Sequence, residues 1–262
     1  MDLGLTGKVA LVCGGSRGIG FATAMEFARE GATVAICGRD AASLEQAAAQ
    51  LRQHATEVLP VVADLATTEG IASAVAQTMG RHGRADILVT NTGGPPTGPS
   101  MTFDWTAWQT ATELLLRSAV ELTRAFVPGM RERKWGRVVG ITSFVLKRPA
   151  PGFVLSNSIR AAVTGYFRTL ADEVAPDGVT VNTVLPGFVE TDRLIGLADA
   201  AVARTGATKA AIYDSWKAES PMRRLGAPEE LAAMIAFLAS ARAGFVTGQA
   251  VCVDGGTIRS LL

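Results

Sequence analysis

Cysteine, histidine and tyrosine are all scarce in this chain of 262 residues, which has three, two and two of them. The cysteines, Cys13, Cys37 and Cys252, stand alone within apolar runs, so neither a CxxC pair nor a zinc-ligand spacing is present. We therefore interpret them as reduced packing residues of a cytoplasmic protein, and we expect no metal site. Of the two tyrosines, Tyr166 is expected in the core and Tyr213 in a surface segment.

An excess of charge of one sign is also missing. The chain has 25 basic and 24 acidic side chains, so nothing in its charge favours binding to nucleic acid or to an anionic membrane. No apolar run approaches the ~20 residues of a membrane span, and the N-terminal segment lacks the pattern of a signal peptide. The apolar share of 48% suits a single domain that buries a sheet on both faces.

Short β-branched apolar runs alternate along the chain with longer helical patterns. Strands are expected at 9–13, 33–37, 57–62, 87–90, 137–142, 179–184 and 250–253. Helices are expected at 19–29, 41–54, 68–82, 105–133, 156–174 and 228–240. Most of the strands are apolar throughout, as parallel strands covered on both faces are. The alternation predicts a doubly wound, Rossmann-type α/β fold of about seven parallel strands, with 1–262 as one domain.

A glycine-rich turn follows the first expected strand directly. VALVC leads into GGSRGIG, and a helical run begins at once. Gly14, Gly18 and Gly20 suit a tight turn, close approach to a pyrophosphate, and close packing of helix on strand. The start of the helix offers unpaired N–H groups to phosphates. This context predicts a dinucleotide site, whose expected contacts from the turn are Gly14, Ser16, Arg17, Gly18, Ile19 and Gly20.

The end of the second expected strand distinguishes NADP from NAD. Proteins that prefer NAD place an acidic residue there, to bind the ribose 2′-hydroxyl. This chain has Gly38 followed by Arg39, a cation suited to a 2′-phosphate, and Arg17 adds a second cation nearby. The alternative is that both arginines are solvated surface charges. The sequence favours NADP over NAD.

One long segment, 187–226, is irregular with a mixed helical pattern, and it interrupts the regular alternation near the C-terminus. Long segments on a compact domain are usually lids or binding loops, so we expect it to cover a substrate. Its apolar character suggests a non-polar substrate. Tyr213 lies within it and can serve as an acid if the segment closes, although a surface role is the alternative.

These motifs together resemble the short-chain dehydrogenase/reductases, in particular 3-oxoacyl-(acyl-carrier-protein) reductases, over essentially the whole chain. CGGSRGIG is similar to the family's TGxxxGxG, TNTGG to its NNAG, and VVGITS carries Ser143 at the position of the catalytic serine. The resemblance implies an NADP-dependent oxidoreductase acting on a carbonyl or alcohol substrate. It also implies pairing of subunits through 105–133 and 156–174, giving a homodimer or homotetramer. The further cofactor contacts that it implies are Asp64, Leu65, Asn91, Gly93, Pro186, Gly187 and Thr191.

The expected catalytic centre departs from the family pattern. The family's tyrosine and lysine positions hold Ser156 and Arg160, and its helix asparagine falls on Leu115, which is not catalytic. An aliphatic hydroxyl is a far weaker acid than a phenol with a pKa near 10, so Ser156 is a poor proton donor. Arg160 keeps a cation that can hold the nicotinamide ribose, and with Ser143 and Ser156 it predicts a polar pocket for a carbonyl or carboxylate. The alternative is that Ser156 and Arg160 only start and pack a helix.

Three functions therefore stay open. The first, which we favour because the cofactor motifs are complete, is an oxidoreductase with an altered proton route through water or a lid residue. The second is an NADP-binding protein without turnover, acting as a sensor or silent subunit. The third is a lyase or isomerase working around Ser143 and Arg160. Fold alone cannot decide among them, because function depends on the site.

Overall fold

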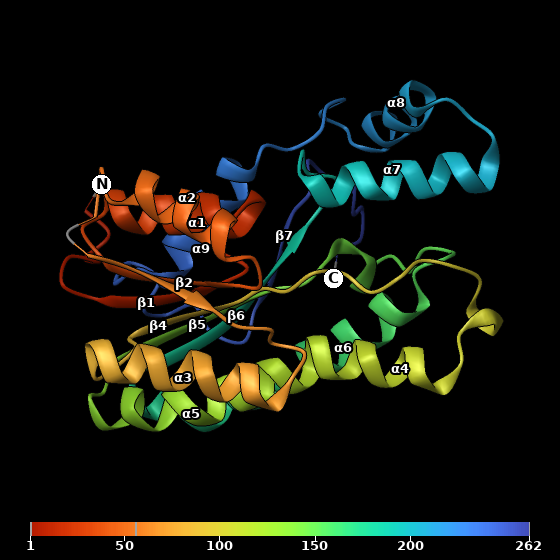
Figure 1. The fold of residues 1–262 in the computed structure, drawn as a ribbon. Helices are drawn as coiled ribbons and strands as arrows, with labels where there is room; N and C mark the ends of the chain where they lie inside the picture. Colours follow the sequence, from red (N-terminus) through yellow and green to blue (C-terminus); the bar gives the residue numbers. More distant parts are fainter. Residues whose placement is uncertain (1, 56, 262) are drawn as a thin grey trace.

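The computed structural model describes residues 2–55 and 57–261. Seven strands form one sheet in the order β3-β2-β1-β4-β5-β6-β7, and all six neighbouring pairs are parallel (Figure 1). The strands are β1 (Val9–Cys13), β2 (Thr33–Gly38), β3 (Val58–Val62), β4 (Ile87–Thr90), β5 (Gly136–Ile141), β6 (Val179–Pro186) and β7 (Ala250–Val253). The predicted Rossmann-type, doubly wound single domain is confirmed.

Helices form a layer on each side of the sheet (Figure 1). One layer contains α1 (Gly18–Arg29), α2 (Ala41–Leu51) and α9 (Pro228–Ala239). The other contains α3 (Thr68–His82), α4 (Trp105–Thr112), α5 (Ser118–Glu132) and α6 (Val154–Val174). Two further helices, α7 (Asp192–Thr205) and α8 (Lys209–Glu219), lie beyond the carboxyl ends of the strands. Within residues 2–55 and 57–261, no helix is long and apolar enough to cross a bilayer.

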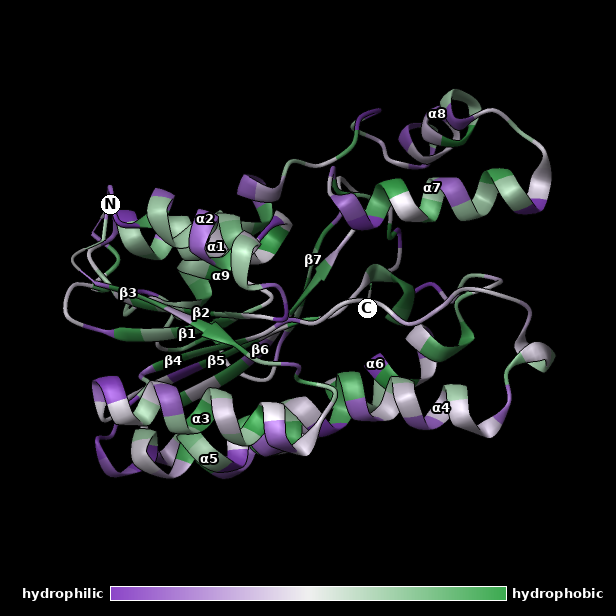
Figure 2. Ribbon diagram, viewed as in Figure 1, coloured by the Kyte–Doolittle hydropathy of each residue, from purple (hydrophilic) through white to green (hydrophobic). Residues whose placement is uncertain are grey.

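Burial on both faces explains why the strands are so apolar. Alternate side chains of a strand point to opposite faces, so Val12 joins the core under α1, α2 and α9, whereas Leu11 joins the core under α3, α5 and α6. Phe27 of α1 and Phe167 of α6 are the largest fully buried side chains. Figure 2 shows apolar strands inside and hydrophilic residues on the outward faces of the helices. With both faces covered, the carboxyl edge of the sheet is left as the place for a binding site.

The helix expected at 105–133 is present over Trp105–Glu132, but one of its turns differs from the regular α-helical geometry. A π-helical turn, Glu113–Arg117, separates α4 from α5. Within it the carbonyl of Leu114 accepts a hydrogen bond from the Ser118 hydroxyl at 2.6 Å, instead of pairing only with backbone N–H groups. Such π turns are rare and occur mostly as single turns within α-helices, often near functional sites.

The cysteines of β1 and β2 lie side by side in the sheet. Cys13 and Cys37 are paired in register and are both fully buried. Burial raises the pKa of the Cys37 thiol to about 12 and that of Cys13 well above its ordinary value. Both therefore stay protonated and unreactive near neutral pH.

Candidate functional site

A crevice opens where the sheet reverses its winding direction. β1 and β4 are neighbours although β2 and β3 separate them in sequence, so the segments that follow them leave toward opposite faces. The glycine-rich turn follows β1, and Asn91 follows β4. The two meet closely, because a Cβ built on Gly14 would lie 2.6 Å from Nδ2 of Asn91. The structure thus brings together two motifs that are far apart in sequence.

The glycines of the turn are required by its geometry. Gly14 and Gly18 have φ values of +61° and +55°, in the left-handed region that favours glycine. A Cβ on Gly20 would lie 2.1 Å from the carbonyl oxygen of Gly14, which leaves no room for a side chain. Arg17 precedes α1, but no side chain among residues 2–55 and 57–261 caps the first N–H groups of the helix, and its first turn has no acidic residue. Such a helix start is suited to a phosphate, and Ile19 anchors it by packing against the core.

The end of β2 lies beside this turn. A Cβ on Gly38 would be 3.6 Å from the Ser16 hydroxyl, which places the following Arg39 next to the crevice. Arg39 is exposed and forms no ion pair within the described part of the chain. The adjacent Asp40 instead caps α2 by accepting the backbone N–H of Ser43 at 2.8 Å, and its hydrogen bonds with Ser43 lower the pKa of Asp40. The cation is therefore available to an anionic ligand.

The other predicted cofactor residues lie at the carboxyl ends of three strands: Asp64 and Leu65 after β3, Gly93 after β4, and Pro186 and Gly187 at the end of β6. Thr191 begins α7 by accepting the N–H of Leu194 at 3.4 Å. Its methyl carbon would be 3.2 Å from a Cβ on Gly18, so this segment returns across the crevice to the glycine turn. An ion pair of 3.0 Å between Arg17 and Asp192 joins the same two segments. The predicted cofactor residues thus all lie along one edge of the sheet.

Ser143, Ser156 and Arg160 lie at the other end of this crevice. Ser143 follows β5, and its hydroxyl accepts a backbone N–H two residues further on at 3.4 Å. Ser156, only 8% exposed, lies in the first turn of α6 and accepts a hydrogen bond from Nε of Arg160 at 3.3 Å. A second guanidinium nitrogen of Arg160 donates to the carbonyl of Ile141 at 3.0 Å. Burial, with a smaller contribution from the positive charge of Arg193, lowers the pKa of Arg160 to about 10.

Leu115 has no polar group to offer this site, and Tyr166 and Tyr213 are engaged in contacts elsewhere. Leu115 is 5% exposed and lies in the π-helical turn, which packs against α6. The hydroxyl of Tyr166 is 2.7 Å from Oγ1 of Thr123, so it is occupied between α5 and α6, and its ring packs against the core. Tyr213 lies in α8 with its ring edge-on to Trp216 at 5.6 Å.

Aromatic contacts hold the 187–226 segment against the body of the protein. The Phe188 ring stacks on Trp216 of α8 at 5.1 Å and contacts Phe144 at the same centroid distance. An ion pair between Arg148 and Glu219 joins the segment after β5 to the end of α8. Phe144 directly follows Ser143 and Phe188 directly follows Gly187, so the motifs that carry the site residues also carry the contacts that hold the 187–226 segment.

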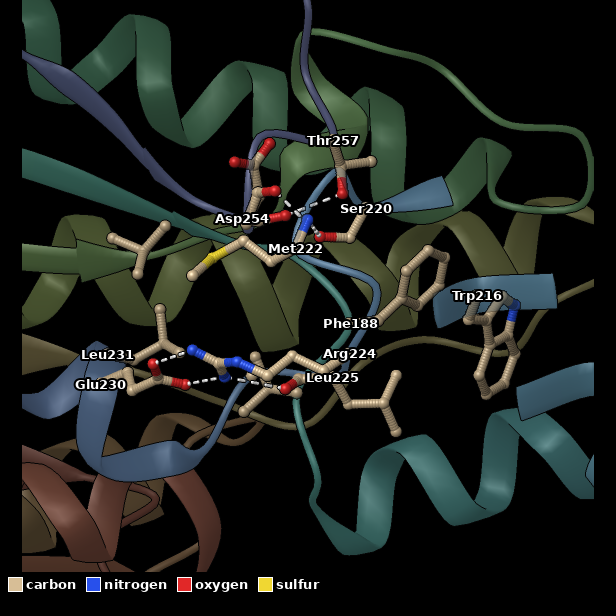
Figure 3. A pocket seen from close by; sticks show the side chains of 14 residues that line it. Phe188, Trp216, Ser220, Met222, Arg224, Leu225, Glu230, Leu231, Asp254 and Thr257 are labelled. Carbon is tan, nitrogen blue, oxygen red and sulfur yellow. Dashed lines mark hydrogen bonds and ion pairs between the residues drawn. The ribbon is translucent and has the colours of Figure 1, made fainter. Parts of the chain in front are cut away.

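Two cavities lie beside this segment. One, of about 100 Å³, is bounded by Phe188 and Trp216 on one side and by the Arg224–Glu230 ion pair on the other (Figure 3). The second, of about 550 Å³, lies between α7 and α8 and includes Thr191. The three predicted catalytic residues line neither cavity. Thr191 therefore connects the larger cavity with the cofactor crevice.

Comparison with known proteins agrees with this geometry. The family model described as enoyl-(acyl carrier protein) reductase matches residues 14–257. The chain belongs to the short-chain dehydrogenase/reductase family. It is 33% identical to 3-oxoacyl-(acyl-carrier-protein) reductase FabG of Pseudomonas aeruginosa, over 98% of this chain and 100% of that protein. It is 34% identical to dehydrogenase/reductase SDR family member 4 of Homo sapiens, over 97% and 88%. L-Sorbose reductase of Gluconobacter frateurii, solved with NADPH and L-sorbose, is 37% identical, covers 100% of both chains and superposes with a TM-score of 0.94.

In this short-chain dehydrogenase/reductase, sequence reasoning missed Gly94 and Arg193. Arg193 donates to the carbonyl of Pro95 at 2.9 Å. A Cβ on Gly94 would lie 2.5 Å from Nη2 of Arg193, so the guanidinium occupies the place of a side chain there. Both residues adjoin motifs that were recognised, as the second glycine of TNTGG and the second residue after Thr191. Their closeness to the two motifs is a signal that the sequence contains, but nothing in the sequence indicates that Gly94 and Arg193 lie together.

Proposed function

We propose that this protein is an NADPH-dependent reductase of a carbonyl substrate that uses Ser156 and Arg160 where related enzymes use a tyrosine and a lysine. The hydrogen bond from Arg160 to Ser156, at the end of a complete dinucleotide crevice, carries this proposal. The reductase relationship supports the reaction class.

The residues of the crevice fit NADPH. Gly14 and Gly18 give the turn the left-handed backbone conformations that its shape requires, and the start of α1 presents N–H groups that no side chain of the described residues caps. Arg39 would bind the 2′-phosphate, with Arg17 beside it. The solved structures of L-sorbose reductase and actinorhodin polyketide ketoreductase contain NADPH. When bound, this cofactor supplies the hydride for a carbonyl carbon.

Three side chains would act on the carbonyl oxygen. Arg160 donates Nε–H to Ser156, so the hydroxyl proton of Ser156 stays free to point at a substrate. The hydroxyl of Ser143 supplies a second donor. The guanidinium of Arg160 stabilises the negative charge that develops on the oxygen, and it remains protonated near neutral pH with a pKa of about 10. The proton itself would come from water or from Tyr213 of the lid, because a serine hydroxyl is too weak an acid.

A binding protein without turnover is the second candidate. Its support is that two donors of Arg160 are already satisfied, by Ser156 and by the carbonyl of Ile141. Consumption of NADPH with a panel of ketones, followed at 340 nm with detection of the alcohol, separates the two functions. We expect slow but measurable reduction. NADPH binding without any reduction would favour the binding protein without turnover. A product formed without NADPH consumption would indicate lyase or isomerase chemistry.

Replacing Arg39 tests the choice of cofactor. We expect wild-type protein to bind NADPH more tightly than NADH, and Arg39→Asp to narrow or reverse that preference by about 10- to 100-fold, because a carboxylate repels the 2′-phosphate. Calorimetric titration of both cofactors measures the change. Arg204→Asp, at an exposed arginine of α7, should leave the preference unaltered. A wild-type preference for NADH would contradict the assignment.

Exposed apolar residues support a homodimer or homotetramer. Trp105, at the start of α4, is 72% exposed, and Phe245, just before β7, is fully exposed. We expect light scattering at micromolar concentration to give two or four times the mass of the chain. Trp105→Lys and Phe245→Glu should each reduce the assembly, because they place a charge at an apolar contact. Met79→Glu, on α3, is the control, and a monomeric wild type would refute this prediction.

A further inference from the structure

Two arginines of the crevice have no acidic partner in the described part of the chain: Arg160 bonds at the end of β5, and Arg193 bonds to the loop that follows the neighbouring strand β4. Arg160 bonds only to Ser156 and to a backbone carbonyl, and Arg193 bonds only to the carbonyl of Pro95, within residues 2–55 and 57–261. The nearest acidic residue in sequence, Asp192, is paired with Arg17 on the other side of the crevice. No carboxylate of the described chain therefore neutralises either guanidinium.

The position of Arg193 depends on Gly94. Arg193 leaves the first turn of α7 and crosses to the loop after β4, where it bonds to Pro95. Its guanidinium lies where any side chain at position 94 would be, since a Cβ there would come within 2.5 Å of Nη2 and 2.7 Å of the central guanidinium carbon. A glycine at this point is what allows the cation to reach into the crevice.

Partial burial without a counterion is energetically unfavourable for each of the two guanidinium groups. Partial burial lowers the pKa of Arg193, and burial together with the charge of Arg193 lowers the pKa of Arg160. Like charges in a partly desolvated crevice cost free energy, which a bound anion recovers. A guanidinium group holds a carboxylate through two parallel hydrogen bonds, which makes Arg193 suited to bind one.

We infer that the substrate of this reductase is an oxo acid, and that Arg193 binds its carboxylate while its carbonyl faces Ser143, Ser156 and Arg160. This inference rests on the proposed function and adds the substrate class. A cofactor phosphate is the other anion to consider, but the start of α1, Arg17 and Arg39 provide for phosphates at the opposite end of the crevice. The bond of Arg160 to Ile141, two residues before Ser143, places Arg160 at the reaction end. The loop to which Arg193 bonds reaches the same end, because its Gly98 pairs with Phe153, three residues before Ser156.

The kinetic test compares 2-oxopentanoate and 4-oxopentanoate with their methyl esters, which lack the charge. We expect the better acid to exceed its ester in kcat/KM by about 10- to 100-fold, the usual contribution of a hydrogen bond to a charged group. Arg193→Gln should remove this difference by raising KM for the acid. Gly94→Ala should act in the same direction because it displaces Arg193. Arg204→Gln, on the same helix, should retain the difference, and the Kd for NADPH should stay unchanged in all three variants.

A binding measurement keeps the inference separate from turnover. The same acids and esters are titrated calorimetrically into protein saturated with NADP. Tighter binding of an acid that Arg193→Gln abolishes supports the inference even if no reduction occurs, in which case only the proposed function fails. Equal binding of acids and esters overturns it. A loss of NADPH affinity in Arg193→Gln with an unchanged ratio of acid to ester also overturns it, because Arg193 would then hold a cofactor phosphate.

Discussion

Protein carrying Ser156→Tyr, Arg160→Lys and Leu115→Asn should reduce simple ketones and 3-oxoacyl esters about 10²- to 10⁴-fold faster than wild type, the usual contribution of general acid catalysis. A phenol has an unperturbed pKa near 10, and an adjacent ammonium group brings it closer to neutrality. Initial rates of NADPH oxidation measure the gain. Ser156→Phe with Arg160→Lys is the matched control, since it adds the ring without the hydroxyl.

The Leu115 substitution needs its own check. Leu115 is buried, so an asparagine there costs about 1–3 kcal/mol if its amide stays unsatisfied. The double variant without it keeps the experiment decisive if the triple variant is unstable. A variant that folds, binds NADPH and stays inert would show that the pocket has diverged beyond its proton donor. A wild type that already reduces these substrates rapidly would instead require another acid, for which Tyr213→Phe is the first test.

Gly20→Ala should abolish NADPH binding and destabilise the fold by about 3 kcal/mol. The added Cβ would be 2.1 Å from the carbonyl oxygen of Gly14, and because the contact is with backbone, no side-chain rotation relieves it. The turn would have to open, which removes the phosphate site. Calorimetry with NADPH and urea denaturation measure the two effects.

Gly80→Ala is the matched control for this substitution. Gly80 lies in α3 with nothing within 4 Å of its Cβ position, so alanine there should stabilise the protein by about 0.5–1 kcal/mol through its higher helix propensity. Normal NADPH binding by Gly20→Ala would refute the close approach of turn and helix. If Gly80→Ala also destabilised the protein, the loss of stability in Gly20→Ala could not be assigned to the clash with the Gly14 carbonyl.

The fold could be predicted because its signals are local. Continuous apolar runs such as 9–13 mark strands buried on both faces, and the helical patterns between them favour a doubly wound arrangement. The glycine turn was recognisable for the same reason, since Gly14, Gly18 and Gly20 act within a single strand–turn–helix unit. Segment ends differ from the structure by up to three residues, as for the helix expected at 41–54, which ends at Leu51.

The sequence by itself thus determined the sheet, the cofactor turn and the identity of Ser156 and Arg160, whereas only the tertiary structure decided what meets at the reaction end. β1 lies next to β4, and β5 next to β6, so the crevice joins segments that are far apart along the chain. Arg193 bonds to Pro95 across 98 positions of sequence, in space that Gly94 leaves open. Periodicity shows which face of a segment is buried but not its partner, because the strand order and the crossings between strands choose that partner.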